Sequence, residues 1–353
     1  MIKSLKIGSA FIGIIVGAGF ASGQEILQYF TSFGIAGILA AILSTALFAY
    51  MGMSLTRIGS RLQTASHKDA LYTIGGRAGG IIMDIIIILT LFGVGVVMIA
   101  GAGSIFSQQF GFPAAYGNTV MALLVTGTIM LNIQRVIGII GSITPFLVLT
   151  VIGLAVYSLA TMDSTFAELD PIAKSADSAL SNWFYSAVNY VSFNIAVGAS
   201  MAIVMGGAEK DEKIAARGGL IGGLGLGILI VLNHLAIFSS IDRVGDSEMP
   251  ILQIANDIAP FLGFIVSLIL FAMIYNTAVS MLFSFTARFA ELNTTRFRIT
   301  VLVVVGLAYS LSFRGFTGLV SEFYPVIGLL GLFLVATLVV TNIRYARDKK
   351  AKA

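Results

Sequence analysis

The chain has 353 residues, of which 57% are hydrophobic and 11% charged, and its mean hydropathy is +0.96. A soluble domain carries about 25% charged residues, so most of this surface must face lipid instead of water. The chain has no cysteine and only two histidines, far apart in the sequence. This excludes disulfide frameworks, cysteine redox chemistry and the usual zinc-ligand spacings. The net charge of +4 is spread over short loops, so we expect a lipid bilayer as partner and no nucleic acid.

Apolar runs of about 20 residues, the length that crosses a hydrocarbon core, recur along the chain. They lack the alternating pattern of a membrane β-barrel, so an all-α integral membrane protein is predicted. The first run has no small-residue cleavage site, and we expect it to be retained as a helix. The ten predicted transmembrane helices cover residues 7–30, 34–56, 78–108, 114–131, 138–160, 183–206, 216–238, 258–287, 299–313 and 319–343.

The basic residues give these helices an orientation. If the N-terminus is cytoplasmic, all 21 lysines and arginines except Lys174, Arg243 and Arg314 fall on the cytoplasmic side. The positive-inside rule predicts this asymmetry, which would be lost if one span were added or removed. Both termini are therefore expected in the cytoplasm. Short additional helices are expected at 59–77, on the cytoplasmic side, and between Pro250 and Pro260, outside.

Five spans in each half would give the two halves opposite orientations, which is the inverted repeat common in transporters. A long third span then pairs with a long eighth, and a glycine-interrupted first span pairs with an interrupted sixth. The predicted organisation is a first five-helix repeat at 1–160, an extracellular loop at 161–182, a second, inverted five-helix repeat at 183–343 and a basic cytoplasmic tail at 344–353.

The first span contains three glycines, Gly17, Gly19 and Gly23, followed closely by Gln24 and Glu25. Each glycine costs about 1 kcal/mol relative to alanine in a helix interior. Unwound backbone at this depth is tolerated only where it is buried in protein or lines a cavity. The N-terminus of a half-helix there suits a carboxylate, and the freed carbonyls suit a cation. The alternative is that the glycines allow close helix packing.

This stretch resembles the unwound first helix of the amino acid–polyamine–organocation (APC) superfamily, the LeuT-fold transporters. The five-plus-five topology extends the resemblance over nearly the whole chain. More closely, the sequence resembles the YkvI-like bacterial membrane proteins, a group expected to be amino acid permeases. The resemblance implies discontinuous helices 1 and 6, a substrate site between helices 1, 3, 6 and 8, and alternating access. It also implies a bacterial cytoplasmic (inner) membrane and a monomer or homodimer.

Polar side chains near the middle of the sixth and eighth spans are costly in hydrocarbon unless they find partners. The resemblance makes the sixth span the second broken helix, facing the first. The alternative is a polar patch that only bonds to neighbouring helices. The candidate substrate-binding residues are Gly19, Ala21, Ser22, Gly23, Ser104, Asn189, Ser192, Phe193, Asn194, Tyr275 and Asn276.

Thr277, Ser280 and Ser284 share one face of the eighth span, because they follow i, i+3, i+7 spacing. The resemblance to sodium-coupled members implies a Na⁺ site made by these helix 8 hydroxyls and the carbonyls at the helix 1 break. Oxygen-only ligation suits such a hard cation, although membrane serines and threonines also bond to their own backbone. No other cofactor is expected. The candidate Na⁺ ligands are Gly17, Phe20, Thr277 and Ser280.

Glu25 and Asp84 are the two acidic residues inside predicted spans, and we assign them to coupling or gating. Glu25 could carry a coupling proton, attract a cationic substrate group, or close an outer gate with Arg243 or Arg314; the alternative is simple solvation in a vestibule. Asp84 lies one or two turns into the third span, at its cytoplasmic end, where the helix dipole favours it. A structural or inner-gate role is therefore predicted for Asp84.

The leading functional hypothesis is a secondary active transporter of a small amino acid or a related zwitterion or amine, coupled to Na⁺ or H⁺. The alternative is a nutrient sensor of the same fold that binds a small solute without sustained transport. A channel is disfavoured because no filter sequence or ring of charges is present. An enzyme is not expected, because the spans hold no pattern typical of a catalytic site.

Overall fold

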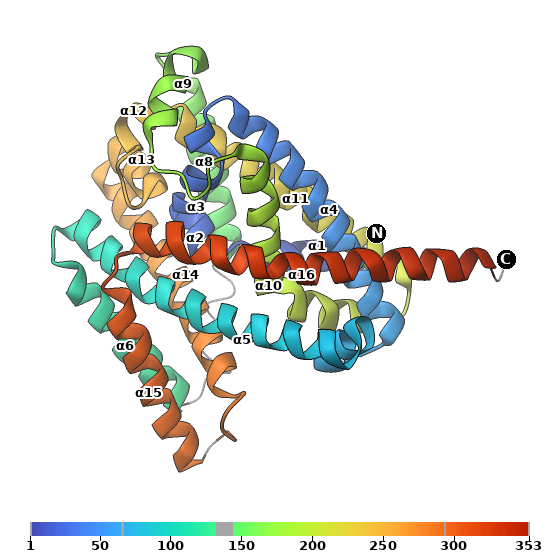
Figure 1. The fold of residues 1–353 in the computed structure, drawn as a ribbon. Helices are drawn as coiled ribbons and strands as arrows, with labels where there is room; N and C mark the ends of the chain where they lie inside the picture. Colours follow the sequence, from blue (N-terminus) through green and yellow to red (C-terminus); the bar gives the residue numbers. More distant parts are fainter. Residues whose placement is uncertain (1, 65–66, 132–143, 293, 352–353) are drawn as a thin grey trace.

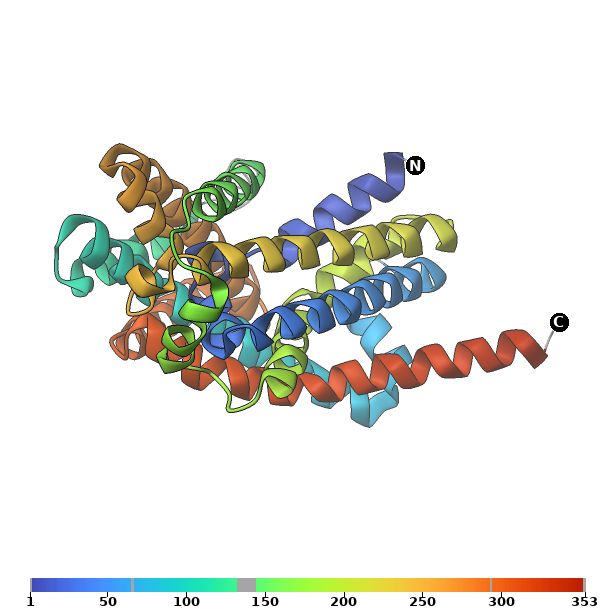
Figure 2. The ribbon, with the colours of Figure 1, turned by 90° about the horizontal axis from the view of Figure 1, so that it is seen from above.

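The computed structural model describes residues 2–64, 67–131, 144–292 and 294–351, and all regular structure in these ranges is helical (Figure 1). The start of the first helix and the end of the last lie at the same end of the molecule, which we call the termini-bearing end (Figure 2). Arg135 and the beginning of the fifth predicted span, residues 138–143, lie outside the described residues.

Within the described ranges, eight helices are long and apolar enough to cross a membrane. They correspond to eight of the predicted spans and are α4 (Ala36–Leu62), α5 (His67–Phe110), α6 (Ala114–Leu131), α10 (Trp183–Gly207), α11 (Glu212–Phe238), α14 (Pro260–Thr286), α15 (Thr295–Ser312) and α16 (Phe316–Ala351). The fifth predicted span contains the shorter α8 (Thr144–Ala160). The protein is therefore a multi-pass, helical membrane protein.

The first predicted span is divided into α1 (Ile2–Ile15), α2 (Ala18–Ser22) and α3 (Gln24–Tyr29). Gly17, before α2, has an extended backbone with φ −94° and ψ −174°. Gly23, between α2 and α3, has φ 85°, a left-handed conformation that is strained for a residue with a side chain. The predicted interruption of this helix is confirmed, and glycine is required at its second bend.

One group of helices contains α1, α4, α10 and α11, and glycines bring its backbones together. A Cβ atom added to Gly219 of α11 would lie 2.1 Å from the carbonyl oxygen of Gly52 on α4. One turn along α11, a Cβ atom on Gly223 would lie 2.4 Å from the carbonyl oxygen of Phe48. Small residues of this kind allow membrane helices to approach closely where no hydrophobic force drives them together.

A second group contains α5, α6, α14 and α15, which pack against one another on the other side of the molecule (Figure 1). The two groups meet through α16, which packs on both α10 and α5, and through α2, which packs on α14. The broken first helix therefore lies between the groups, where it can contribute to a site shared by both.

Short helices cover the end of the molecule opposite the termini: η1 (Thr31–Phe33), α9 (Phe166–Ser175), α12 (Ile241–Val244) and α13 (Pro250–Ile258) (Figure 1). The helix expected between Pro250 and Pro260 is confirmed as α13. Asp170 on α9 accepts hydrogen bonds from Lys174 at 2.6 Å and from the Ile35 amide at 2.8 Å. These two bonds hold the pKa of Asp170 below its ordinary value and fasten α9 to the start of α4.

The segment expected to form a separate helix at 59–77 is instead shared between two long helices. α4 continues to Leu62, and α5 begins at His67. Gly76 interrupts α5 with φ 65° and ψ −171°, so the turns before it form a separate arm of the same helix. The third span is therefore extended at its termini-bearing end by a bent segment.

The prediction that the sixth span is discontinuous is wrong, because α10 is helical from Trp183 to Gly207. Its polar side chains bond to other groups without breaking the helix. Asn189 donates to the Pro325 carbonyl at 2.9 Å, and Ser192 donates to the Gly328 carbonyl at 2.6 Å, both on α16. The polar residues of α10 thus bond to a neighbouring helix, which was the alternative interpretation for this span.

The glycine contact between α4 and α11 predicts the effect of adding a single methyl group. Gly219→Ala should lower the free energy of unfolding by about 1–3 kcal/mol, because overpacking forces backbones apart. Gly306→Ala on α15 is the matched control, since a Cβ atom there meets nothing within 4 Å. It should leave stability unchanged or raised by up to about 1 kcal/mol through helix propensity. Thermal unfolding in detergent measures both, and equal stability of the two variants would contradict the packing described.

Candidate functional site

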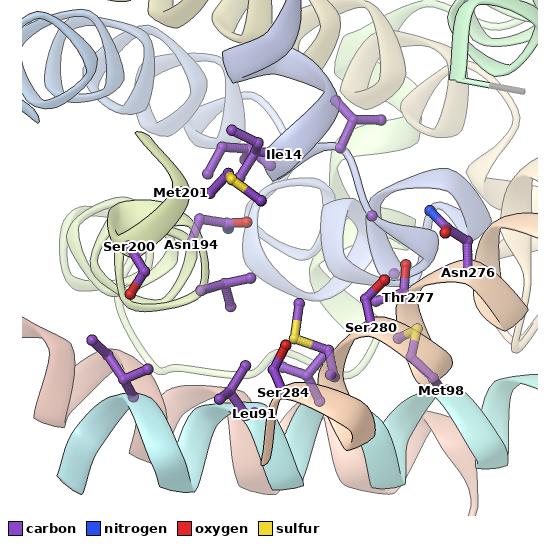
Figure 3. A pocket seen from close by; sticks show the side chains of 18 of the residues that line it. Ile14, Leu91, Met98, Asn194, Ser200, Met201, Asn276, Thr277, Ser280 and Ser284 are labelled. Carbon is purple, nitrogen blue, oxygen red and sulfur yellow. The ribbon is translucent and has the colours of Figure 1, made fainter. Parts of the chain in front are cut away.

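A cavity of about 680 Å³ lies between the two helix groups, beside the break in the first helix. Figure 3 shows α14 on one side with Asn276, Thr277, Ser280 and Ser284, and α10 on another with Asn194, Ser200 and Met201. The α5 side chains Leu91 and Met98 close a further wall (Figure 3). Pockets for small molecules have volumes of about 300–1,000 Å³, so the size fits a small solute with a path to the surface.

Glu25 lines the cavity although it belongs to α3, beyond the second bend of the first helix. Its side chain is buried, and its Oε2 accepts a hydrogen bond from the Tyr190 hydroxyl at 3.2 Å. A Cβ atom on Gly19 would lie 1.9 Å from its Oε1, so the carboxylate rests directly over this glycine. Tyr190 is itself fixed by edge-on packing against Phe30, with ring centroids 4.9 Å apart. Gly19 and Tyr190 together define where this carboxyl group lies.

One hydrogen-bond acceptor on α14 receives no hydrogen bond. Oδ1 of Asn276 is buried and has no hydrogen-bond partner among the described residues. Such an atom costs about 1–3 kcal/mol unless something donates to it. Asn276 also lines the cavity, although this oxygen atom itself is buried. The neighbouring Thr277 hydroxyl donates to the Met273 carbonyl of its own helix at 3.0 Å.

The α10 wall combines aromatic and polar groups. Phe193 stacks on Tyr324 of α16, with ring centroids 4.1 Å apart. Asn194 donates to the Tyr190 carbonyl of its own helix at 2.9 Å, which leaves its side-chain oxygen at the cavity. Ser200 also lines the cavity, and its hydroxyl has no hydrogen-bond partner among the described residues. This wall therefore offers an apolar surface next to unengaged polar atoms.

The four candidate Na⁺ ligands are only partly brought together. Gly17, Thr277 and Ser280 line the cavity. Phe20 does not line it in this conformation, because its carbonyl accepts from the Asn233 side chain of α11 at 3.1 Å and from the Gly23 amide at 3.2 Å. Both lone pairs of that oxygen are occupied, so the predicted ligand set is incomplete here.

Of the candidate substrate-binding residues, four line the cavity, namely Gly19, Phe193, Asn194 and Asn276. The others are buried or half-buried elsewhere. Asn189 and Ser192 bond to α16, as described above, and Tyr275 bonds through its hydroxyl to Thr128. Ser22 donates to the Gly19 carbonyl at 2.8 Å and accepts from the Gln24 amide at 3.2 Å, so it shapes the break itself. The remaining candidates that do not line the cavity are Ala21, Gly23 and Ser104.

The cavity extends toward the termini-bearing end, where Val204 at the end of α10 and Arg288 just beyond α14 line it. Arg288 forms an ion pair with Asp84 of α5, with 2.7 Å between Nη1 and Oδ1. Both side chains are 20% exposed, so the pair stands at the mouth of the cavity. The structural or inner-gate role of Asp84 stays a prediction.

Beyond the end of the cavity that lies away from the termini, polar contacts join α3 and α5 to the loop before α13. Gln108 of α5 donates to the Met249 carbonyl at 3.1 Å and accepts from the Met249 amide at 3.0 Å. It also accepts from the Ser247 hydroxyl at 3.0 Å. Gln24 faces the backbone carbonyls of Ser247 and Glu248 at 3.1 and 3.2 Å. The loop before α13 is thereby bound to α3 and α5, above the solute cavity.

Two expected gate partners of Glu25 are engaged elsewhere. Arg243 lies 3.6 Å from Asp257, and Arg314 lies 3.0 Å from Glu322. The hypothesis that either arginine closes an outer gate with Glu25 is therefore wrong for this conformation. Glu25 faces inward to Tyr190 because the bend at Gly23 turns α3 into the protein.

Several residues of the site were not predicted. Arg288 was counted only as a topological charge, although it continues the α14 face of Thr277, Ser280 and Ser284. Ser200 lies beyond the polar cluster in the middle of the sixth span. Tyr324 belongs to α16, and no pattern in the sequence indicates that this helix contributes to the site.

The comparisons with known proteins agree with this architecture. No protein-family model matches the chain. It is 24% identical over 335 residues to the uncharacterized membrane protein YkvI of Bacillus subtilis, covering 94% of each chain. It is 27% identical over 328 residues to the uncharacterized protein YyaD of the same organism, covering 93% of each. The resemblance to YkvI-like proteins is thus confirmed as one between sequences.

Among solved structures, the chain is similar to MhsT in complex with L-phenylalanine, with a TM-score of 0.63, 15% identity and coverage of 96% of this chain and 98% of that one. It is also similar to the inward-facing conformation of Mhp1, with a TM-score of 0.59, 13% identity and coverage of 93% and 73%. A manganese transporter of Eremococcus coleocola gives a TM-score of 0.61, 13% identity and coverage of 95% and 78%. The chain thus has the fold of LeuT-fold transporters, as predicted.

The direction in which the cavity opens can be tested with a single introduced thiol, because the chain has no cysteine. Ser284→Cys should react with a membrane-impermeant maleimide from the side that carries the termini. From the other side the reaction should be at least about tenfold slower, since a minor conformation is populated at about 0.1–10%. Ser104→Cys is the control: Ser104 is 2% exposed and outside the cavity, so it should react only after unfolding. Faster labelling of Ser284→Cys from the opposite side would show that the cavity opens the other way.

Proposed function

We propose that the protein is a secondary active transporter that moves a small amino acid, or a related zwitterion or amine, by alternating access. The observation that carries the proposal is the cavity at the break of the first helix, which holds a buried carboxylate and an unsatisfied amide oxygen. Glu25 and Asn276 both require donors, and an ammonium group supplies them. Arg288 supplies the opposite charge at the mouth, where a substrate carboxylate would pass.

The proposed topology is ten spans in two inverted five-helix repeats, with both termini in the cytoplasm of a bacterial cell. The eight long helices, the divided first span and α8 support this count. The predominance of basic residues on the proposed cytoplasmic side supports the orientation. With this orientation the cavity extends toward the cytoplasmic side, where Val204 and Arg288 line it. We further propose an APC-superfamily member that acts as a monomer or homodimer.

Alternating access requires two gates that do not open together. The inner gate in this proposal is the ion pair between Asp84 and Arg288, across α5 and α14. The outer gate is the set of bonds that Gln108 and Gln24 make with the loop before α13. In the structure the outer bonds and the inner ion pair are both formed, and the cavity extends as far as Arg288 of the inner pair.

Two coupling ions are compatible with the residues present. Gly17, Thr277 and Ser280 place three oxygen groups at the cavity, which suits Na⁺. A proton could instead bind Glu25, the one carboxylate that lines the cavity in the described chain. Mhp1 is described as a nucleobase-cation-symport-1 family transporter, so the fold supports cation symport in another protein.

Uptake into liposomes tests both the function and the role of Glu25. The purified protein should accumulate an amino acid or amine under a Na⁺ or H⁺ gradient. Glu25→Gln should reduce uptake about ten- to hundredfold or shift its pH dependence, because a bond to a charged group contributes about 1.5–3 kcal/mol. Glu322→Gln is the matched control, since Glu322 is 65% exposed and outside the cavity.

The first outcome to examine is whether the wild-type protein accumulates solute at all. Ligands can be found beforehand by thermal-shift screening of amino acids, amines and osmolytes with and without Na⁺. Binding without accumulation under any gradient would contradict a transporter and support the solute sensor. Wild-type uptake by Glu25→Gln at every pH would remove Glu25 from the mechanism while leaving the transporter intact.

The candidate Na⁺ site predicts a separate result. Thr277→Ala combined with Ser280→Ala should raise the Na⁺ concentration for half-maximal uptake by about tenfold, since lost ligands cost about 1.4 kcal/mol or more. Thr300→Ala combined with Ser310→Ala removes two hydroxyls that bond to their own helix, α15, and should change nothing. Uptake that never depends on Na⁺ would show that this site is wrongly assigned.

A further inference from the structure

A second groove, of about 530 Å³, lies at the termini-bearing ends of α4, α11 and α16. It shares no lining residue with the solute cavity. Figure 2 shows the three helices running beside one another toward the termini, with α4 between the other two. The groove lies where the apolar parts of these helices give way to charged residues. In a membrane helix such a change marks the level of the lipid headgroups.

The groove is cationic. Arg57 and Arg61 come from α4 and Lys213 from α11, and the only carboxylate in the lining is Glu212. Arg61 pairs with Glu212, with 2.7 Å between Nε and Oε2, and its guanidinium lies 4.9 Å from the centre of the Tyr345 ring. Arg57 and Lys213 form no ion pair with any residue that the structure describes. The charges of Arg61 and Glu212 cancel each other, so the groove keeps two net positive charges, those of Arg57 and Lys213.

An unused hydrogen-bond donor belongs to a residue that lines the same groove. Nδ2 of Asn342 on α16 is covered by protein and has no acceptor among the described residues, although Asn342 lines the groove. An amide nitrogen can only donate, so a phosphate oxygen would satisfy it. Arg57 is half-buried, which strengthens its attraction for an anion relative to a fully solvated side chain. The positive charges would attract an anionic oxygen group, and the unpaired N–H group could donate a hydrogen bond to it.

The edge of the groove is apolar. Ile343 is 48% exposed there, and Met53 and Tyr50 continue the lining along α4. A soluble anion would make no contact with this apolar edge, whereas the acyl chains of a lipid would cover it. Basic pockets between membrane helices on the cytoplasmic side commonly bind the headgroups of anionic lipids. The combination of charge, donor, depth and apolar edge therefore favours a phospholipid over free phosphate.

We propose that this groove binds the phosphate of an anionic phospholipid from the leaflet on the side of the termini. The guanidinium of Arg57, the ammonium group of Lys213 and Nδ2 of Asn342 hold the phosphate oxygens. Arg61, fixed by Glu212 and Tyr345, forms the wall behind them. A lipid in this position connects α16 to α4 and α11, and so stabilises the contact between these helices.

The test uses the full-length protein, purified in detergent and delipidated. Dioleoylphosphatidylglycerol, tetraoleoyl cardiolipin or dioleoylphosphatidylcholine is added, and retained lipid is measured by native mass spectrometry and thermal unfolding. The two anionic lipids should bind and raise the unfolding temperature, and phosphatidylcholine should do neither. Arg57→Gln combined with Lys213→Gln should weaken anionic lipid binding at least about tenfold, because each charge contributes about 1 kcal/mol.

Arg296→Gln combined with Arg298→Gln is the matched control, because it removes two exposed charges from the start of α15, far from the groove lining. It should bind like the wild type. Asn342→Leu keeps every charge and should still weaken binding, which separates a built site from general attraction to positive charge. Equal losses in the α15 control, no loss in Asn342→Leu, or stabilisation by inorganic phosphate equal to that by phosphatidylglycerol would each overturn the proposal.

Discussion

The backbone released where the first membrane span breaks must find hydrogen bonds inside the protein, and the rest of the site depends on how it does so. Water is absent from the hydrocarbon core, so each unsatisfied group there costs several kcal/mol. Ser22 bonds to both sides of the second bend, and Asn233 donates to the Phe20 carbonyl. The short α2 is thereby held between α11 and α14. Its glycine face then leaves room for Glu25.

The two helix groups differ in how their contacts are made, and this difference matters for movement between them. Inside the first group, α4 and α11 touch backbone to backbone at Gly52 and Gly219, where little sliding is tolerated. Between the groups, four methionines line the cavity, namely Met98, Met201, Met273 and Met281. Methionine side chains are unbranched and adaptable, so they can repack when neighbours shift. The contacts inside the first group are therefore less adaptable than those that line the cavity.

Composition and charge predict much of this fold, because a membrane span leaves a signal of about 20 apolar residues that tertiary contacts do not erase. The glycine cluster predicts the break for a similarly local reason. Glycine is costly inside a helix, and it is the residue that readily adopts the left-handed backbone found at Gly23. The site itself is less predictable. A polar residue in a span must have a partner, yet the sequence does not say which. Asn189 and Ser192 of α10 bond to α16, whereas Asn276 of α14 faces the cavity with its oxygen unpaired.

The same ambiguity explains why the sixth helix was expected to break and does not. Its asparagines donate hydrogen bonds to carbonyl groups of α16 and of α10. The polar cluster is therefore compatible with a continuous helix and does not mark an unwound one. The first helix has glycines at its bends, while α10 has only Gly198 near its middle, and that glycine admits the Ile15 side chain of α1. Polar residues alone therefore do not predict a broken span. A cluster of glycines is the better signal in this chain.

The two proposed gates are both weak in energy. The ion pair of Asp84 and Arg288 is partly exposed, and such pairs contribute at most about 1 kcal/mol. The outer bonds of Gln108 are ordinary neutral hydrogen bonds, each with a net value near 1 kcal/mol. Neither gate is strong enough to hold one conformation permanently, so the two conformations of a transporter would differ by only a few kcal/mol. A solute that binds one of them more tightly by a similar amount can shift the population, as alternating access demands.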